Sequence, residues 1–114
     1  MEQFLLNFHH FPIPAGVKPS AEEFDAINKQ WQDYIGGIAA QGLFVGTQRL
    51  DQAGSIIHPD GSVTAAVNEG KGLIVGTLTI KANSIDHALE LVKGCPVLAM
   101  GGSVEVRPIL QFDI

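Results

Sequence analysis

His9 and His10 stand side by side near the N-terminus of this 114-residue chain, and they are its first candidates for chemistry. They close a run of alternating apolar and polar residues that is typical of a strand, so an imidazole there can face a pocket. Histidine suits general acid–base catalysis, but neighbouring strand residues point to opposite faces, so the two cannot form one bidentate site. The alternative, which the pattern favours without a defined partner, is that both are polar residues at a strand end.

Glu105 and Arg107 stand two residues apart in a run that predicts a strand, so both side chains lie on one face. An arginine there can clamp a ligand carboxylate with two parallel hydrogen bonds. The alternative is a Glu–Arg pair that fixes packing across strands or across a dimer interface, and both interpretations stay open. Glu69 and Lys71 lie in a glycine-rich loop without P-loop or dinucleotide-binding spacing. We expect these four charged residues to bind a ligand.

Other polar clusters have simpler explanations. His58 and Asp60 flank Pro59 and could pair as base and orienting carboxylate, but the following glycine makes a hairpin turn the better explanation. His87 lies off the apolar stripe of a predicted helix and is expected to be solvated. The histidines lack a helical His-x-x-x-His spacing, so no metal and no cofactor is predicted. Cys95, the single cysteine, excludes an intramolecular disulfide and is expected to be a small buried residue.

Composition predicts one domain over residues 1–114, with 46% hydrophobic and 17% charged residues. The net charge of −5 and the seven scattered Lys and Arg residues argue against nucleic acid and anionic membranes as partners. No apolar run approaches the roughly 20 residues of a membrane span, and the N-terminus has no basic segment typical of a signal peptide. We therefore expect a cytoplasmic protein.

The first half of the chain predicts a strand, a helix and a second strand. Residues 3–9 alternate as a strand does, and a proline-rich loop follows. Ser20 and Glu23 form a capping box for a helix that runs to about Ala40, with Gly42 as its C-terminal cap. The apolar face of this helix comprises Phe24, Ile27, Trp31, Tyr34, Ile35 and Ile38.

The second half predicts a hairpin, a strand, a helix and a closing strand. The expected strands cover residues 43–50, 55–57, 62–67, 73–81 and 104–110. Ser84 caps the second helix, Pro96 ends that region, and the buried stripe comprises Ile85, Ala88, Leu89 and Val92. The order β-α-β-hairpin-β-α-β is that of an α+β, ferredoxin-like fold.

A second copy of the chain is the expected partner. Two helices on one face of a four-stranded sheet leave the other face to be covered. Strand 73–81 is fairly apolar on both sides, and the mean hydropathy of the chain is +0.20. These features favour a homodimer that packs sheet against sheet.

Several stretches, in this order and at these spacings, resemble the YCII-related, or DGPF-domain, family. They are residues 4–6, Trp31 with residues 35–42, Leu50 with Gly54, and residues 73–76, 84–96 and 104–108. The resemblance covers nearly the whole chain and implies a dimeric α+β barrel, in which two ferredoxin-like sheets pack face to face. Relatives of that fold include monooxygenases, muconolactone isomerase and dye-decolourising peroxidases.

The loop that names the DGPF family is altered in this chain. Its Asp corresponds to Thr64 and its Gly-Pro pair to Ala65 and Ala66, while Glu69 and Lys71 are retained. The resemblance also implies a catalytic histidine on the first helix of some members, yet residues 20–42 contain none. Both departures favour ligand binding over catalysis.

Three functions are compatible with these residues. The first is a small-molecule-binding dimeric module. The second is a cofactor-independent enzyme that acts on a small carbonyl-bearing or aromatic compound through His9 or His10. The third is an accessory protein linked to transcription initiation, which rests on family labels alone.

Overall fold

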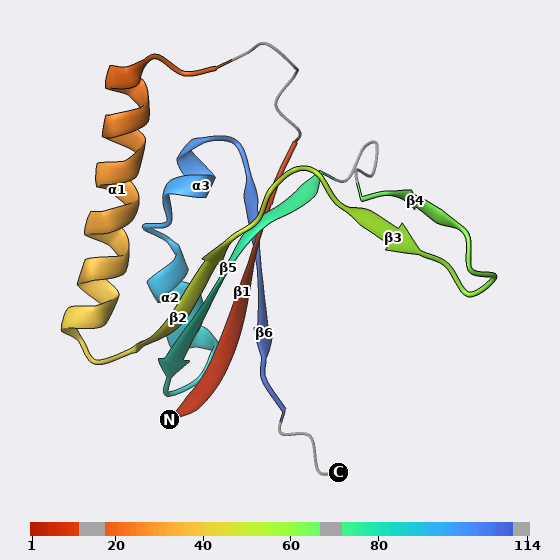
Figure 1. Cartoon of the computed structure of the whole chain (residues 1–114). Coiled ribbons are helices and arrows are strands. Elements are labelled where there is room, and N and C mark those ends of the chain that lie inside the picture. The colour runs from red at the N-terminus through yellow and green to blue at the C-terminus, as the bar shows by residue number, and fades with distance from the viewer. Residues whose placement is uncertain (12–17, 67–71, 111–114) are drawn as a thin grey trace.

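The chain is described by a computed structural model that covers residues 1–11, 18–66 and 72–110 (Figure 1). Its elements, in chain order, are β1 (Glu2–His10), α1 (Ala21–Ala40), β2 (Phe44–Arg49), β3 (Ser55–Ile57), β4 (Val63–Ala65), β5 (Leu73–Ala82), α2 (Ile85–Val92), α3 (Pro96–Ala99) and β6 (Ser103–Pro108). Among the described residues, no helix combines the length and the apolar character that crossing a membrane requires.

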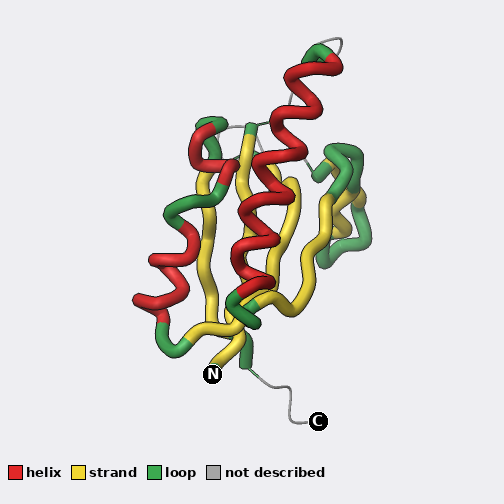
Figure 2. The backbone as a smooth tube through the Cα atoms, turned by 90° about the vertical axis from the view of Figure 1, so that its left-hand side faces the viewer, coloured by secondary structure: helices red, strands yellow, loops and turns green. Residues whose placement is uncertain are grey.

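The main sheet has four strands in the order β2-β5-β1-β6, and each neighbouring pair is antiparallel. α1 connects β1 to β2, and α2 with α3 connects β5 to β6, so both connections cross the same face (Figure 2). This is the predicted ferredoxin-like α+β arrangement. β3 and β4 pair only with each other and form a separate hairpin between β2 and β5.

Local chemistry explains where α1 begins and ends. The Ser20 hydroxyl accepts a hydrogen bond from the Glu23 backbone N–H at 3.1 Å and donates one to the Glu23 carboxylate at 3.1 Å, so the predicted cap is confirmed. Gly42 follows the helix with φ +74°, a conformation that favours glycine. Of the predicted apolar face, Ile38 is buried, Trp31 and the neighbouring tyrosine are half-buried, and the start of the helix is exposed.

The core lies between the sheet and the helices. Phe4, Leu6 and Phe8 of β1 alternate toward the helix side, where Leu78 and Ile80 of β5 meet them. The Trp31 ring packs against the Phe8 ring with the centroids 5.1 Å apart. Each fully buried aliphatic or aromatic side chain of this kind stabilises the fold by about 1.5–3 kcal/mol.

The second helical region differs from the sequence prediction. Ala88 and Val92 of α2 are buried as expected, but Ile85 and Leu89 are 42% and 45% exposed. A helix of eight residues contacts the sheet along a narrow line, so part of its apolar stripe stays outside the contact. Pro96 does not end the region, since it begins the unpredicted α3, where its fixed φ suits a first helical position.

The second face of the sheet carries no helix in the described part of the chain (Figures 1 and 2). We call it the open face. The strand registers place on it Leu5, Asn7, His9, Gly46, Gln48, Ile74, Thr77, Thr79, Ser103, Glu105 and Arg107. Most of these side chains are polar, so the expected apolar second face is only partly realised.

Candidate functional site

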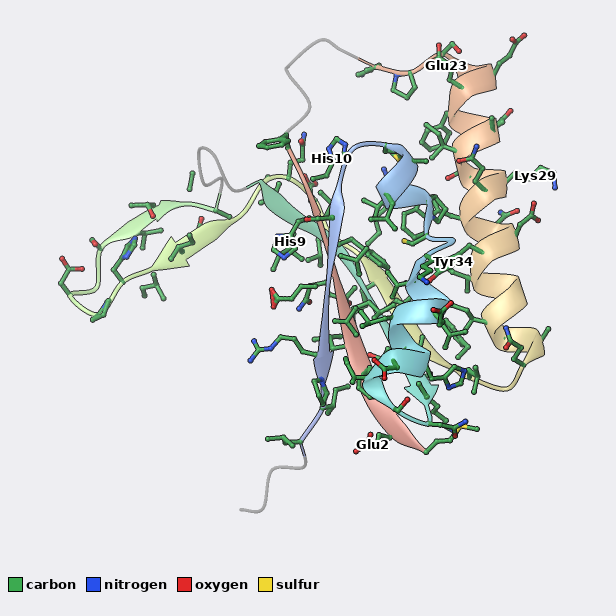
Figure 3. All side chains as sticks on the ribbon, turned by 180° about the vertical axis from the view of Figure 1, so that it is seen from behind. Glu2, His9, His10, Glu23, Lys29 and Tyr34 are labelled. Atoms are coloured by element: carbon green, nitrogen blue, oxygen red, sulfur yellow. The ribbon has the colours of Figure 1, made fainter. Side chains whose placement is uncertain are left out.

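The open face brings together three of the residues singled out from the sequence. His9 Nε2 on β1 lies 3.6 Å from Glu105 Oε1 on β6, and Glu105 Oε2 lies 3.9 Å from an Arg107 guanidinium nitrogen. Figure 3 shows His9 pointing away from the helices, toward the side on which the hairpin lies. A carboxylate thus stands between two cationic or potentially cationic groups on adjacent strands.

The register of two strands positions this cluster. β6 pairs with β1 so that Glu105 lies opposite Asn7, Arg107 opposite Leu5, and His9 opposite a serine. His9 therefore reaches Glu105 diagonally, a distance that long side chains span in an antiparallel pair. The side chains of His9, Glu105 and Arg107 are 27%, 46% and 72% exposed.

The cluster is free to rearrange around a ligand. Ion pairs this exposed contribute about 0–1 kcal/mol, so little stability is lost when the contacts change. The guanidinium of Arg107 carries five N–H donors, and its one contact with Glu105 leaves most of them available. The cluster can therefore accept a carboxylate on Arg107 while Glu105 stays next to His9.

A polar row continues from Glu105 across the sheet. Asn7 on β1, Thr77 on β5 and Gln48 on β2 are successive cross-strand neighbours in that row. None of their side chains makes a hydrogen bond to another residue within 1–11, 18–66 and 72–110. These amide and hydroxyl groups are available to a ligand on the open face.

His10 has a different environment from His9. Its Nδ1 lies 2.8 Å from the Phe11 carbonyl oxygen and its Nε2 lies 2.9 Å from the Met100 carbonyl oxygen. A carbonyl oxygen only accepts hydrogen bonds, so each contact needs a proton on the ring nitrogen that makes it. His10 thus ties the end of β1 to the turn before β6, with each ring nitrogen against a carbonyl oxygen.

His10 and Arg107 are not brought together. Arg107 pairs with Leu5, five residues from His10 along β1, which corresponds to about 17 Å of strand. Glu69 and Lys71 lie outside the described residues. Gly72, which follows that loop, lies against β1, because a Cβ atom on it would be 3.0 Å from the His10 carbonyl oxygen.

A small hollow of about 80 Å³ lies beside His9 at the end of β1. Gly72, Gly101 and Gly102 form much of its wall. Its volume is well below the roughly 300–1,000 Å³ that is typical of small-molecule pockets. It can take a small group of a ligand that lies on the open face, but not a whole organic molecule.

The hairpin histidine pairs with a hydroxyl group rather than a carboxylate. His58 Nε2 lies 2.8 Å from Thr64 Oγ1, while Asp60 accepts hydrogen bonds from the Ser62 hydroxyl at 2.7 Å and the Ser62 N–H at 2.9 Å. These bonds, led by the hydroxyl, lower the pKa of the Asp60 carboxyl. The turn interpretation is confirmed. The His58–Thr64 contact was not predicted, although residues that flank a tight turn at this separation become cross-strand neighbours.

Two further sequence candidates have structural roles. The half-buried His87 accepts a hydrogen bond from the Asn83 N–H at 3.0 Å next to the start of α2, so it is not simply solvated. Cys95 is 3% exposed, and burial raises the pKa of its thiol. Within the described ranges, no three His, Cys, Asp or Glu residues converge as metal ligands would.

A second, larger depression lies on the helix side, between α1 and the turn before α3. It has a volume of about 560 Å³ and is lined in part by Asp33, Tyr34 and Lys93. The Tyr34 hydroxyl donates a hydrogen bond of 2.7 Å to the Leu91 carbonyl oxygen, and burial raises its pKa. Asp33 and Lys93 each pair with another charge on their own helical segment. These groups are already engaged, whereas, among the residues that the structure describes, the amide and hydroxyl groups of Asn7, Thr77 and Gln48 on the open face are not.

The sequence model of the YCII-related domain family matches residues 12–113. No curated protein matches the chain.

Proposed function

Since this chain belongs to the YCII-related domain family, we propose that it is a small-molecule-binding module that acts as a homodimer. The observation that carries the proposal is the His9–Glu105–Arg107 cluster on the open face. The ligand class is a small organic carboxylate. Glu69 and Lys71, which lie outside the described residues, are proposed as further contacts.

The chemistry of Arg107 supports a carboxylate ligand. Its 3.9 Å contact with Glu105 is too long for a hydrogen bond, and the side chain is 72% exposed. A ligand carboxylate can replace this contact with two parallel, charge-assisted hydrogen bonds, which are shorter and stronger. The free amide of Asn7, on the neighbouring strand, can donate to the same ligand.

The open face supports the homodimer. A four-stranded sheet with helices on one face leaves its other face in water unless a second layer covers it. Two sheets that pack face to face lie about 10 Å apart, and a second copy would shield the polar row from bulk water. Hydrogen bonds and ion pairs to a ligand are stronger in such a shielded space.

Calorimetric titration tests the ligand class with two matched probes. Benzoate should bind to the wild-type protein and to Arg49→Gln, and benzyl alcohol, which lacks the carboxylate, should not. Arg107→Gln should weaken benzoate binding roughly tenfold or more, because a bidentate charged contact is lost. Arg49 is the matched control, since it is the other arginine of the chain and lies on β2. Equal affinity of Arg107→Gln and wild type for benzoate would contradict the proposal.

The second candidate function is a cofactor-independent enzyme, and the His9–Glu105 contact favours it. A carboxylate 3.6 Å from an imidazole needs to move only a few tenths of an ångström to hydrogen-bond one ring nitrogen and leave the other as a base. Such a base would move a proton from the carbon next to the carbonyl group of a keto acid. In D₂O, wild-type protein should then catalyse deuterium exchange into the methyl group of pyruvate, and His9→Gln should not. Exchange at the uncatalysed rate would exclude this activity toward pyruvate.

A further inference from the structure

The β3–β4 hairpin exposes apolar side chains without packing on the main sheet. Ile57 and Val63 are cross-strand partners on one side of the hairpin, and they are 75% and 61% exposed. The strands are joined by a tight turn, in which the His58 N–H donates to the Ser62 carbonyl oxygen at 2.8 Å. An isolated two-stranded hairpin is at best marginally stable in water. This one therefore has an apolar side that gains stability from a partner surface.

The direction of the hairpin points to where that partner lies. It leaves the end of β2 and projects away from the helix layer (Figures 1 and 3). His9 of the open face points to the same side (Figure 3). The hairpin therefore extends past the open face, alongside the space in which a second copy would sit.

The size of the open face also calls for additional contact. Four strands about 4.8 Å apart and six residues of about 3.4 Å each give an area of roughly 400 Å² in projection. A standard interface buries about 800 Å² on each partner and has an apolar centre. Leu5 and Ile74 are the large apolar side chains among the open-face residues defined above. The hairpin supplies both the missing area and the missing apolar side chains.

A complementary apolar surface lies at the opposite end of the sheet. Ile109 and Leu110, directly after β6, are 42% and 85% exposed. The Ile109 N–H donates to the Gln3 carbonyl oxygen at 2.9 Å, which holds this segment beside the first residues of β1. The hairpin lies near the other end of the strands, because β2 ends and β5 begins there. The hairpin leaves the β2 edge of the sheet and Ile109 and Leu110 follow the β6 edge, so the two surfaces lie at diagonally opposite corners. A two-fold axis in the plane between two sheets, diagonal to the strands, brings these corners together.

We propose that the β3–β4 hairpin is an arm that clasps a second copy of this chain. Ile57 and Val63 of one copy pack against Ile109 and Leu110 of the other, and the two-fold axis repeats the contact. This inference rests on the homodimer of the proposed function and specifies how that dimer is held.

Sedimentation equilibrium tests the arm. Ile57→Asp/Val63→Asp should raise the dimer dissociation constant roughly thirtyfold or more, the effect of losing an interface hot spot. Ile56→Asp is the matched control, because it lies on the same strand but on the other side of the hairpin, and it should dimerise as the wild type does. Circular dichroism should show native secondary structure in all variants, since the hairpin lies outside the core. Wild-type dimerisation in the double variant overturns the arm but leaves the dimer standing, and a monomeric wild type overturns both.

Disulfide trapping tests the orientation. An equimolar mixture of Ile57→Cys and Leu110→Cys, oxidised with diamide, should give a covalent heterodimer, and each variant alone should not. The wild type is the background control, since its single Cys95 is 3% exposed. Cross-linking of Ile57→Cys to itself, without the heterodimer, would mean that the two hairpins meet at the axis and would overturn the proposed contact.

Discussion

Glu105 lies 3.6 Å from His9, measured between Oε1 and Nε2, although neither residue is the other's cross-strand partner. The carboxylate leans diagonally from its own pair, Asn7, toward the imidazole, and its second oxygen stays 3.9 Å from Arg107. Glu105 is thus positioned to compete with any anionic ligand for the same cations. That competition predicts that a substitution within the site should raise the affinity for the ligand rather than lower it.

Removal of the Glu105 charge should strengthen the binding of benzoate. Glu105→Gln leaves Arg107 without its nearby carboxylate, and an exposed pair of this kind is worth up to about 1 kcal/mol, so the affinity should rise up to about fivefold. Titration calorimetry measures the change, and Glu90→Gln, which breaks an ion pair with Lys93 on the helix side, is the control. Weaker binding in Glu105→Gln would show that Glu105 contacts the ligand directly.

Two glycines should respond to alanine with opposite signs. A Cβ atom on Gly102 would lie 2.5 Å from the His9 carbonyl oxygen and 2.6 Å from Val97 Cγ2, so Gly102→Ala should destabilise the fold by about 1–3 kcal/mol. Gly37 lies inside α1 with nothing within 4 Å of such an atom, so Gly37→Ala should stabilise by about 0.5–1 kcal/mol. Urea unfolding measures both. If Gly102→Ala left the free energy of unfolding unchanged, the backbone at the end of β1 would shift easily to accept the new Cβ atom. His9 would then not be held in place.

The sequence predicts the elements well because their signals are local. The alternation of Phe4, Leu6 and Phe8 shows a strand with one buried side, and the Ser20–Glu23 box marks a helix start within four residues. How many residues of an apolar helix stripe become buried is not a local property. The helical spacing of the apolar residues predicts that Ile85 is buried. Its burial, however, depends on how α2 lies on the sheet, which is a tertiary property.

The candidate site is predicted only in part, for a similar reason. Strand parity places Glu105 and Arg107 on one face from their spacing alone. That His9 joins them depends on the register between β1 and β6, two strands that are far apart in the sequence. The different environment of His10 arises in the same way, because its partner Met100 lies in a turn that no local pattern connects to β1.

The hairpin turn should make the stability of the folded protein depend on pH at low pH. The pKa of Asp60 lies below its ordinary value of 3.8 because the Ser62 hydroxyl and N–H donate to the carboxylate. A depressed folded-state pKa means that the stabilisation is present above 3.8 and is lost as pH falls through the folded-state value. Carboxyl ¹³C NMR titration should show the low pKa in the wild type and a rise toward 3.8 in Ser62→Ala. An unchanged pKa in Ser62→Ala would mean that the hydroxyl bond does not persist in solution.

Two leucines distinguish the structure from the pattern in the sequence. Leu78 is fully buried between the sheet and the helices, so Leu78→Ala should lower the free energy of unfolding by about 2–5 kcal/mol. Leu89 was predicted from its spacing to be buried but is 45% exposed, so Leu89→Ala should change that free energy by less than about 1 kcal/mol. Urea unfolding at the same protein concentration gives both variants the same concentration-dependent contribution from self-association, so their free energies of unfolding can be compared. If both substitutions destabilise the protein equally, α2 packs more deeply in solution than the structure shows, and the predicted stripe was right. If only Leu78→Ala does so, the sheet and not the outer edge of α2 holds the core in which β1 and its His9 are anchored.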